Sequence, residues 1–155
     1  MQPRILVPCD FSPATECAVR WAAGLQRSIG GGSITLVHVL SAVPIPGGLE
    51  EAPLLPPTEA NVKQAEAALR EVAARLTPGA AVAVLLGNHV PSGILATANA
   101  WPADLIVMGT HGRSGMKRLV MGGVTDYLIR HARCPVVTMR APRDGSTAAE
   151  SISVQ

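Results

Sequence analysis

Short apolar runs alternate with helical segments along almost the whole chain. The runs cover residues 5–7, 34–40, 80–86, 105–108 and 135–139, and they are mostly apolar without the in-and-out alternation of a half-exposed strand. The segments between them carry apolar residues at helical spacing. Buried strands separated by helices indicate a parallel sheet with helices on both faces, so we predict a doubly wound, Rossmann-like α/β domain. In such sheets a ligand lies beyond the carboxyl ends of the strands.

The first helix has a clear start and stop. Ser12 can cap free N–H groups, Pro13 suits the first helical position, and the three glycines at 30–32 permit the left-handed angles that end a helix. Its apolar positions at helical spacing, expected to form one face, are Cys17, Ala18, Trp21, Ala22, Leu25 and Ile29.

A second helix opens at Thr58 and carries two i,i+4 charge pairs, Glu66 with Arg70 and Glu71 with Arg75. The 17 residues before it, 41–57, contain five prolines and no helical or strand period. Loops of that length are usually functional or mobile. Two further helices are expected at residues 91–100 and from about Val124.

The composition fits one domain and excludes several classes of protein. A chain of 155 residues is long enough to bury a core without disulfides, so we expect a single domain at residues 1–141 and a disordered tail at 142–155. Thirteen basic and 11 acidic residues give a net charge of +2, too small for nucleic-acid binding by counterion release. No apolar run is long enough to cross a membrane or to serve as a signal peptide, which predicts a cytoplasmic protein.

The chain has three cysteines, Cys9, Cys17 and Cys134, without C-x-x-C spacing. Neither a zinc site nor dithiol redox chemistry is supported by that number and spacing. We interpret the cysteines as small buried residues.

Glycines follow the fourth apolar run and precede the last helix. Glycines at a strand end let backbone approach a ligand, and a helix N-terminus offers unpaired N–H groups to a phosphate. Arg113 lies between Gly112 and Gly122 and could add a charged hydrogen bond. The alternative is that the glycines only form turns and that the basic residues are a solvated face. Neither a P-loop nor the G-x-G-x-x-G fingerprint is present.

His111 lies inside the glycine turn, but its sequence neighbours supply neither a nucleophile paired with a carboxylate nor a second metal ligand. We therefore assign it to the shape and hydrogen bonding of the phosphate site rather than to catalysis.

The spacing Gly109-x2-Gly112-x9-Gly122 resembles the nucleotide-binding signature of the universal stress protein family, G-x2-G-x9-G-(S/T). Further similar segments extend the resemblance from Ile5 to Arg140. It implies an adenine nucleotide alpha hydrolase-like sheet of five parallel strands in the order 3-2-1-4-5, which brings Asp10 and Gly109 to the same crevice. It also implies ATP as the ligand, with Mg²⁺ or Mn²⁺ on the phosphates.

The resemblance assigns Asp10 to the nucleoside, the main chain of Val39 to adenine and the glycines to the phosphates. Asp10 has a second interpretation, as a residue that helps to start the first helix. The chain departs from the signature at Gly123, where the family has serine or threonine, so one phosphate-binding hydroxyl is missing and Thr125 is a possible substitute. The predicted nucleotide-binding residues are Pro8, Asp10, Val39, Met108, Gly109, His111, Gly112, Arg113, Gly122, Gly123, Val124 and Thr125.

Two functions follow from the resemblance. One is an ATP-binding regulatory module in the stress response. The other is a nucleotide-free interaction protein of the same fold that acts through dimerisation and partner binding. Gly123 in place of serine or threonine favours this second function. No general base or arginine finger can be named, so at most weak ATP hydrolysis is expected. The last strand, Pro135 to Met139, would offer an open edge for a homodimer.

Overall fold

The computed structural model describes residues 2–44, 54–110 and 123–141. Four predicted ligand residues, His111, Gly112, Arg113 and Gly122, lie outside the described residues, as does the predicted tail at 142–155.

The predicted parallel sheet is confirmed. Its strands are β1 (Arg4–Pro8), β2 (Ser33–Leu40), β5 (Ala81–Leu86), β6 (Leu105–Gly109) and β7 (Val136–Met139), in the spatial order β5-β2-β1-β6-β7. All neighbouring pairs are parallel. The labels differ from the order 3-2-1-4-5 because β3 and β4 lie outside this sheet; counted among its own strands, the sheet has that order. The order reverses between β1 and β6, so a ligand crevice is expected there.

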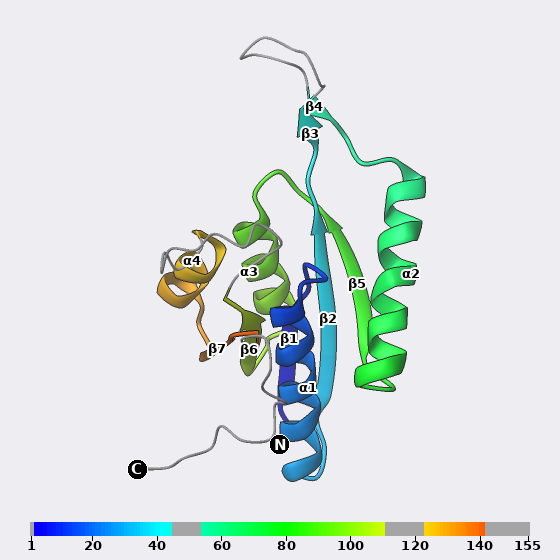
Figure 1. Ribbon diagram of the computed structural model, residues 1–155. Helices are drawn as coiled ribbons and strands as arrows, with labels where there is room; N and C mark the ends of the chain where they lie inside the picture. Colours follow the sequence, from blue (N-terminus) through cyan, green and yellow to red (C-terminus); the bar gives the residue numbers. More distant parts are fainter. Residues whose placement is uncertain (1, 45–53, 111–122, 142–155) are drawn as a thin grey trace.

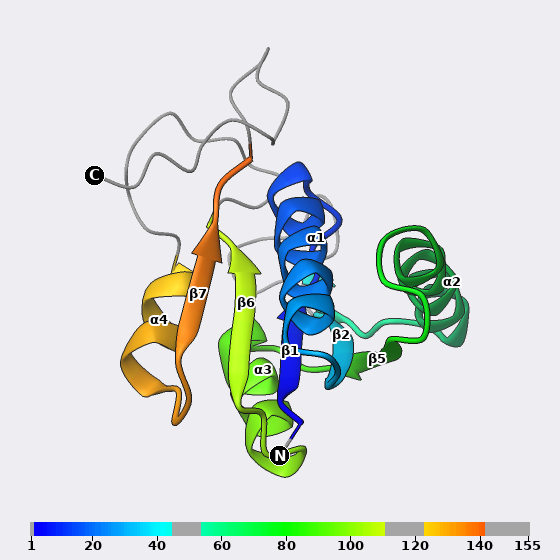
Figure 2. The same cartoon turned by 90° about the horizontal axis from the view of Figure 1, so that it is seen from below.

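Helices cover both faces of the sheet (Figures 1 and 2). The helices α1 (Pro13–Ser28) and α2 (Glu59–Leu76) lie on one face, and α3 (Val90–Ala100) and α4 (Gly123–His131) lie on the other. Successive side chains of β1 point to opposite faces, so Ile5 and Val7 pack under α1 and α2, while Leu6 packs under α3 and α4. None of the helices in the described ranges is both long and apolar enough to span a membrane.

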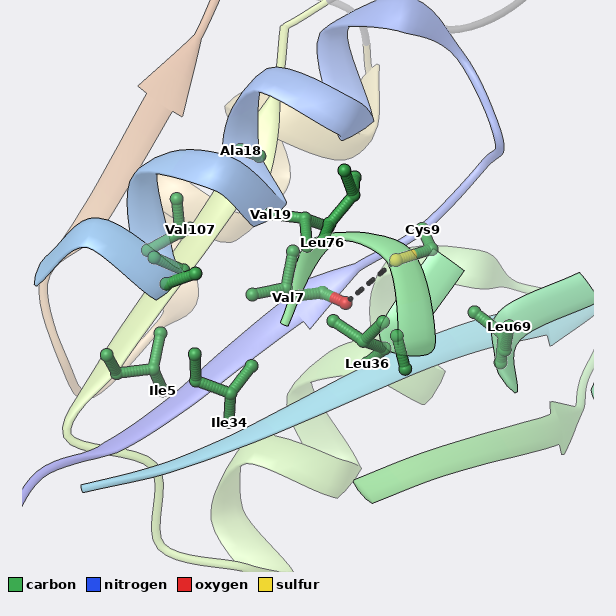
Figure 3. Packing of buried hydrophobic residues seen from close by; sticks show 13 residues of the cluster. Ile5, Val7, Cys9, Ala18, Val19, Ile34, Leu36, Leu69, Leu76 and Val107 are labelled. Atoms are coloured by element: carbon green, nitrogen blue, oxygen red, sulfur yellow. Dashed lines mark hydrogen bonds between the residues drawn. The ribbon is translucent and has the colours of Figure 1, made fainter. Parts of the chain in front are cut away.

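The core under α1 and α2 is built from small and branched apolar residues (Figure 3). Val19 of α1 and Leu69 of α2 are fully buried, together with Val7 and Leu36 of the sheet. Cys9 belongs to this cluster, with 5% of its surface exposed, which confirms its interpretation as a small buried residue; Cys17 and Cys134 are only partly buried.

The start of α1 is as predicted, and its buried face is as predicted in part, since Ala18 and Ala22 are fully buried. Ser12 caps the helix by accepting a hydrogen bond from the Thr15 N–H at 3.3 Å, and Pro13 opens it. Trp21 and Ile29, expected on the apolar face, are 38% and 49% exposed. The buried positions are mainly small residues, which let the helix lie close to the sheet; they are Ala14, Thr15, Ala18, Val19, Ala22 and Ala23.

Two details of the second helix and its approach differ from the prediction. The connection at 41–57 was expected to contain no strand, but β3 (Val43–Pro44) and β4 (Leu54–Leu55) form a short antiparallel pair. Glu66 and Arg70 pair as predicted, at 2.9 Å. Arg75 instead donates two hydrogen bonds to Glu16 of α1, at 2.7 and 3.3 Å, so it joins the two helices on that face.

Candidate functional site

A cavity of about 360 Å³ lies at the carboxyl ends of β1, β2 and β6, between them and the first turns of α3 and α4. Its position matches the switch point of the sheet, where doubly wound proteins bind ligands. The volume falls within the range of about 300–1,000 Å³ found for small-molecule pockets. The described lining residues are Pro8, Cys9, Asp10, Thr15, Val37, His38, Val39, Val90, Ile94, Met108, Gly109, Thr110, Gly123, Val124 and Thr125.

The cavity brings together residues that lie up to 117 positions apart, from Pro8 to Thr125. Every predicted ligand residue that the structure describes lines it: Pro8, Asp10, Val39, Met108, Gly109, Gly123, Val124 and Thr125. The remaining predictions, on His111, Gly112, Arg113 and Gly122, stay predictions, since these residues lie outside the described ranges.

Asp10 follows β1 and is held by the start of α1. Its Oδ1 atom accepts a hydrogen bond from the Ser12 N–H at 3.0 Å and another from the Thr15 hydroxyl at 2.6 Å. Burial alone would raise the pKa of this carboxyl, but the hydrogen bonds from Ser12 and Thr15 outweigh burial and hold the pKa below its ordinary value. Asp10 is therefore ionised at neutral pH. It is both a helix-start residue and a carboxylate on the wall of the cavity.

The turn that carries Asp10 is fixed from the neighbouring strand. Phe11 has a φ of 62°, a left-handed conformation uncommon for a bulky residue. Its ring lies 4.8 Å from that of His38 on β2. His38 Nδ1 is 2.7 Å from the Cys9 carbonyl oxygen, which can only accept, so Nδ1 carries the hydrogen and donates it. The strain at Phe11 is thus held in place by packing and hydrogen bonding.

Gly109 ends β6 and packs against the first turn of α1. A Cβ atom at this position would lie 2.8 Å from Ala14 Cβ, 2.9 Å from Ala14 C and 3.0 Å from Thr15 N. Real Cβ atoms essentially never come within 3.0 Å of such neighbours. Glycine here was expected to give a ligand access to the backbone, but the structure requires it for helix packing. A bulky substitution would therefore disturb the fold and not only the cavity.

The amino end of α4 forms the opposite wall. Gly123 begins the helix, and no atom of the described residues lies within 4 Å of a Cβ placed there. Thr125, only 2% exposed, lines the cavity from the first turn of α4. Unpaired N–H groups and the helix dipole make this end attractive to an anion. Asp10 is the only Asp, Glu, Lys or Arg among the described lining residues.

Sequence reasoning did not find the lining residues of α3 or the role of Thr15. Val90 and Ile94 of α3 lie four residues apart and close the apolar side of the cavity together with Val37. Their i,i+4 spacing marks a helix face, but only the fold shows that this face meets the ends of the strands. Thr15 lies on the first turn of α1, where a threonine is usually interpreted as part of the helix start.

Other chemistry finds little support in the described residues. Burial, with the charge of Asp10 as a smaller cause, raises the pKa of the Cys9 thiol to about 12, so this cysteine is not a nucleophile. Within residues 2–44, 54–110 and 123–141, no three His, Cys, Asp or Glu side chains gather into a group that could hold a metal ion.

Comparison with known proteins places the chain in a family. The model of the universal stress protein family matches residues 1–140. The chain belongs to the universal stress protein family. Universal stress protein MJ0531 of Methanocaldococcus jannaschii is 27% identical, with 90% of this chain and 83% of that protein covered. A universal stress protein of Mycolicibacterium smegmatis is 33% identical over 87% of this chain, which spans only 47% of that longer protein.

Solved universal stress proteins have the same fold. UspA from Lactobacillus plantarum superposes with a TM-score of 0.68 at 25% identity, covering 89% of this chain and 97% of that one. A universal stress protein from Archaeoglobus fulgidus, solved in complex with dAMP, gives a TM-score of 0.63 at 23% identity over 90% of this chain and 98% of that one. A family protein from Arabidopsis thaliana with AMP bound gives 0.58 at 15% identity, over 95% and 97%.

Proposed function

We propose that this universal stress protein binds an adenine nucleotide, ATP, in the cavity and acts as a nucleotide-dependent regulatory module in the stress response. The observation that carries the proposal is the convergence of Asp10, the end of β6 and the start of α4 on one cavity at the switch point of the sheet. The adenine nucleotides bound to related structures, dAMP and AMP among them, support it. Regulation would follow if nucleotide occupancy changed the partners or the shape of the protein.

The lining divides into an apolar and a polar part that suit the two ends of a nucleotide. Val37, Val90 and Ile94 offer an apolar slot for a flat base, with the main chain of Val39 beside it. Asp10 is ionised and can accept hydrogen bonds from ribose hydroxyls. The N–H groups at the start of α4 and the Thr125 hydroxyl are the described donors for phosphate oxygens.

A divalent cation would be held mainly by the phosphates. Mg²⁺ typically binds through one or two carboxylates together with substrate phosphates. Asp10 is the one carboxylate among the described lining residues and is assigned to the ribose, so the phosphates would hold the ion and an all-protein cage does not fit. When bound, the ion would screen phosphate charge, while the chain's own residues bind and orient the nucleoside.

The nucleotide proposal is tested by isothermal titration calorimetry with Mg-ATP and by chromatography of nucleotides released from freshly purified, acid-denatured protein. Asp10→Asn should weaken binding, while Glu59→Gln, which changes an exposed carboxylate on α2, should leave it unchanged. The proposal is refuted if the wild-type chain gives no titration heat with Mg-ATP and also releases no adenine nucleotide.

Gly123→Ser tests the phosphate end by adding the hydroxyl of the family signature. A Cβ placed at residue 123 meets no atom of the described residues within 4 Å, so the serine displaces none of these neighbours. One more hydrogen bond to a charged acceptor should tighten ATP binding about tenfold, since such a bond contributes about 1.5 kcal/mol. Gly123→Ala is the matched control, and equal affinity in both variants would place the phosphates elsewhere.

We also propose that the protein forms a homodimer through β7. In the described sheet this strand pairs only with β6, so its outer edge carries unpaired backbone groups. The carbonyls of Pro135 and Met139 accept hydrogen bonds from the N–H groups of Ile106 on β6 and of Thr110 just after it. Thr138 is one position out of phase with them, so its N–H points to the open edge.

Light scattering on a size-exclusion column should give twice the 16.0 kDa chain mass. Thr138→Pro removes the outward N–H and should give monomers, while Thr138→Val keeps it and should remain dimeric. A wild-type mass of one chain at micromolar concentration would contradict the dimer.

A further inference from the structure

Thr15 occupies a position from which it can control the orientation of Asp10. The side chain is buried, with 3% of the residue exposed, and it lines the cavity beside the carboxylate. Its hydroxyl lies 2.6 Å from Asp10 Oδ1, the shortest of the hydrogen bonds around this turn. A short bond to an ionised oxygen is the stronger kind of hydrogen bond.

The direction of this bond is fixed by the surrounding donors. The Asp10 N–H donates to Thr15 Oγ1 at 3.3 Å, and the Ser12 hydroxyl does so at 3.4 Å. A threonine hydroxyl has one hydrogen, and an ionised carboxylate can only accept, so that hydrogen points to Asp10. The Thr15 oxygen therefore both receives from the main chain of Asp10 and donates to its side chain.

The Thr15 hydroxyl is not the group that caps the helix. Ser12 already caps α1 by accepting from the Thr15 N–H. The main chain of Thr15 is also fixed from outside the helix, because the end of β6 at Gly109 packs directly against it. Thr15 thus presents its hydroxyl from a backbone held by two elements, α1 and β6.

The bonds leave the second carboxylate oxygen for another partner. The hydrogen bonds from the Ser12 N–H and from the Thr15 hydroxyl both end on Asp10 Oδ1. Oδ2 accepts neither of them, and Asp10 is half-buried on the cavity wall. Fixing Oδ1 restricts where Oδ2 can point.

We propose that Thr15 is a positioning residue: its hydroxyl fixes the Asp10 carboxylate so that the free oxygen meets the ribose hydroxyls of the bound nucleotide. The inference rests on the proposed nucleotide function. Thr15 does not need to contact the nucleotide; it acts through Asp10. The site then selects a nucleotide with free ribose hydroxyls over one without them, and that selectivity depends on the Thr15 hydroxyl.

Calorimetry with ATP and with 2′,3′-dideoxy-ATP tests the inference in the full chain. Thr15→Val keeps the shape of the side chain and removes the hydroxyl, whereas Thr15→Ser keeps the hydroxyl. Thr97→Val is a matched control, because the Thr97 hydroxyl donates a hydrogen bond to the Gly93 carbonyl within α3. Thr15→Val should lose about fivefold in affinity for ATP, the effect of one hydrogen bond, and almost none for the dideoxy analogue. Thr15→Ser and Thr97→Val should bind both ligands like the wild type.

A ligand-free measurement covers the case in which no nucleotide binds. Among the described lining residues, the other titratable groups are Cys9, which directly follows β1, and His38 on β2; the described lining residues of α3, α4 and β6 include no titratable group. The pKa of Asp10, followed by carboxyl ¹³C NMR, should rise in Thr15→Val because a bond to the charged form is lost, and should return in Thr15→Ser.

The outcomes separate the two proposals. Equal loss of affinity for ATP and for the dideoxy analogue, or an unchanged Asp10 titration in Thr15→Val, overturns the positioning role. A wild-type chain that binds neither ligand refutes the nucleotide function and with it the ribose selectivity, while the titration still decides whether Thr15 holds Asp10. A loss confined to ATP that serine restores supports the inference.

Discussion

The contact between Gly109 and the start of α1 predicts a large effect of a single methyl group. In Gly109→Ala the new Cβ would lie 2.8–3.0 Å from two atoms of Ala14 and from Thr15 N, well inside van der Waals contact. Two of these are backbone atoms, so no flexible side chain can yield, and α1 must move away from β6. Gly109 does not have positive φ, so the cost is steric rather than conformational.

Overpacking of this kind costs about 1–3 kcal/mol, and the clash with backbone puts Gly109→Ala at the upper end. The reduced freedom of the unfolded chain offsets about 0.4–1 kcal/mol of this. We therefore expect a net loss of about 2 kcal/mol, or roughly 4–8 °C in melting temperature for a domain of this size.

Urea denaturation followed by circular dichroism measures the change. Gly123→Ala is the matched control, since in the described part of the chain no atom lies within 4 Å of its Cβ, and it should be neutral or slightly stabilising. A Gly109→Ala protein within 0.5 kcal/mol of the wild type, measured beside that control, would show that α1 and β6 are not in close contact.

Three further predictions concern other parts of the protein. Gly93 lies inside α3, and Gly93→Ala should stabilise the fold by about 0.5–1 kcal/mol in the same urea assay. A Cβ at this position makes ordinary contacts of 3.5–3.9 Å with Val39 of β2 and Leu85 of β5, so a destabilised variant would contradict the prediction. Cys9 should resist iodoacetamide in the native protein at pH 8, since its pKa of about 12 keeps the thiol protonated, and mass spectrometry should find it labelled only after denaturation. The pKa of Asp10 is lowered in the folded state, so this carboxylate contributes stability that is present above its unfolded pKa of about 3.9 and is lost as the pH falls through the folded value. Asp10→Asn should therefore lose less stability between pH 7 and pH 3 than the wild type does. Equal losses would mean that folding does not stabilise the carboxylate.

The sheet was predictable because its signal is local. Buried parallel strands are apolar on both faces, and each run was followed by a helix with its own start signals, such as Ser12 and Pro13. The carboxyl ends of the predicted strands located the site, and Asp10 directly follows the first of them. The roles of Asp10 and Val39 came from the resemblance to the universal stress protein family, and both residues line the cavity.

The errors arose where packing between distant segments decides the outcome. Trp21 fits the helical period of α1, but the sheet leaves room there mainly for small side chains, so the tryptophan stays partly exposed. Arg75 has an acidic residue four positions earlier, yet Glu16 on the neighbouring helix offers it two hydrogen bonds. Pattern reasoning treats each element alone, so it cannot weigh a partner supplied by another element.

The packing around Gly109 also changes what the glycine signature can be taken to mean. Glycine at this position is required by α1 whether or not a nucleotide is bound, so its presence supports the fold more than the ligand. The residues that bear on binding are Gly123, where the described residues leave room for a serine, and Thr15, whose hydroxyl hydrogen is donated to the Asp10 carboxylate. Nucleotide binding in a chain of this kind is therefore better judged from the carboxylate and the groups that orient it than from the first glycine of the signature.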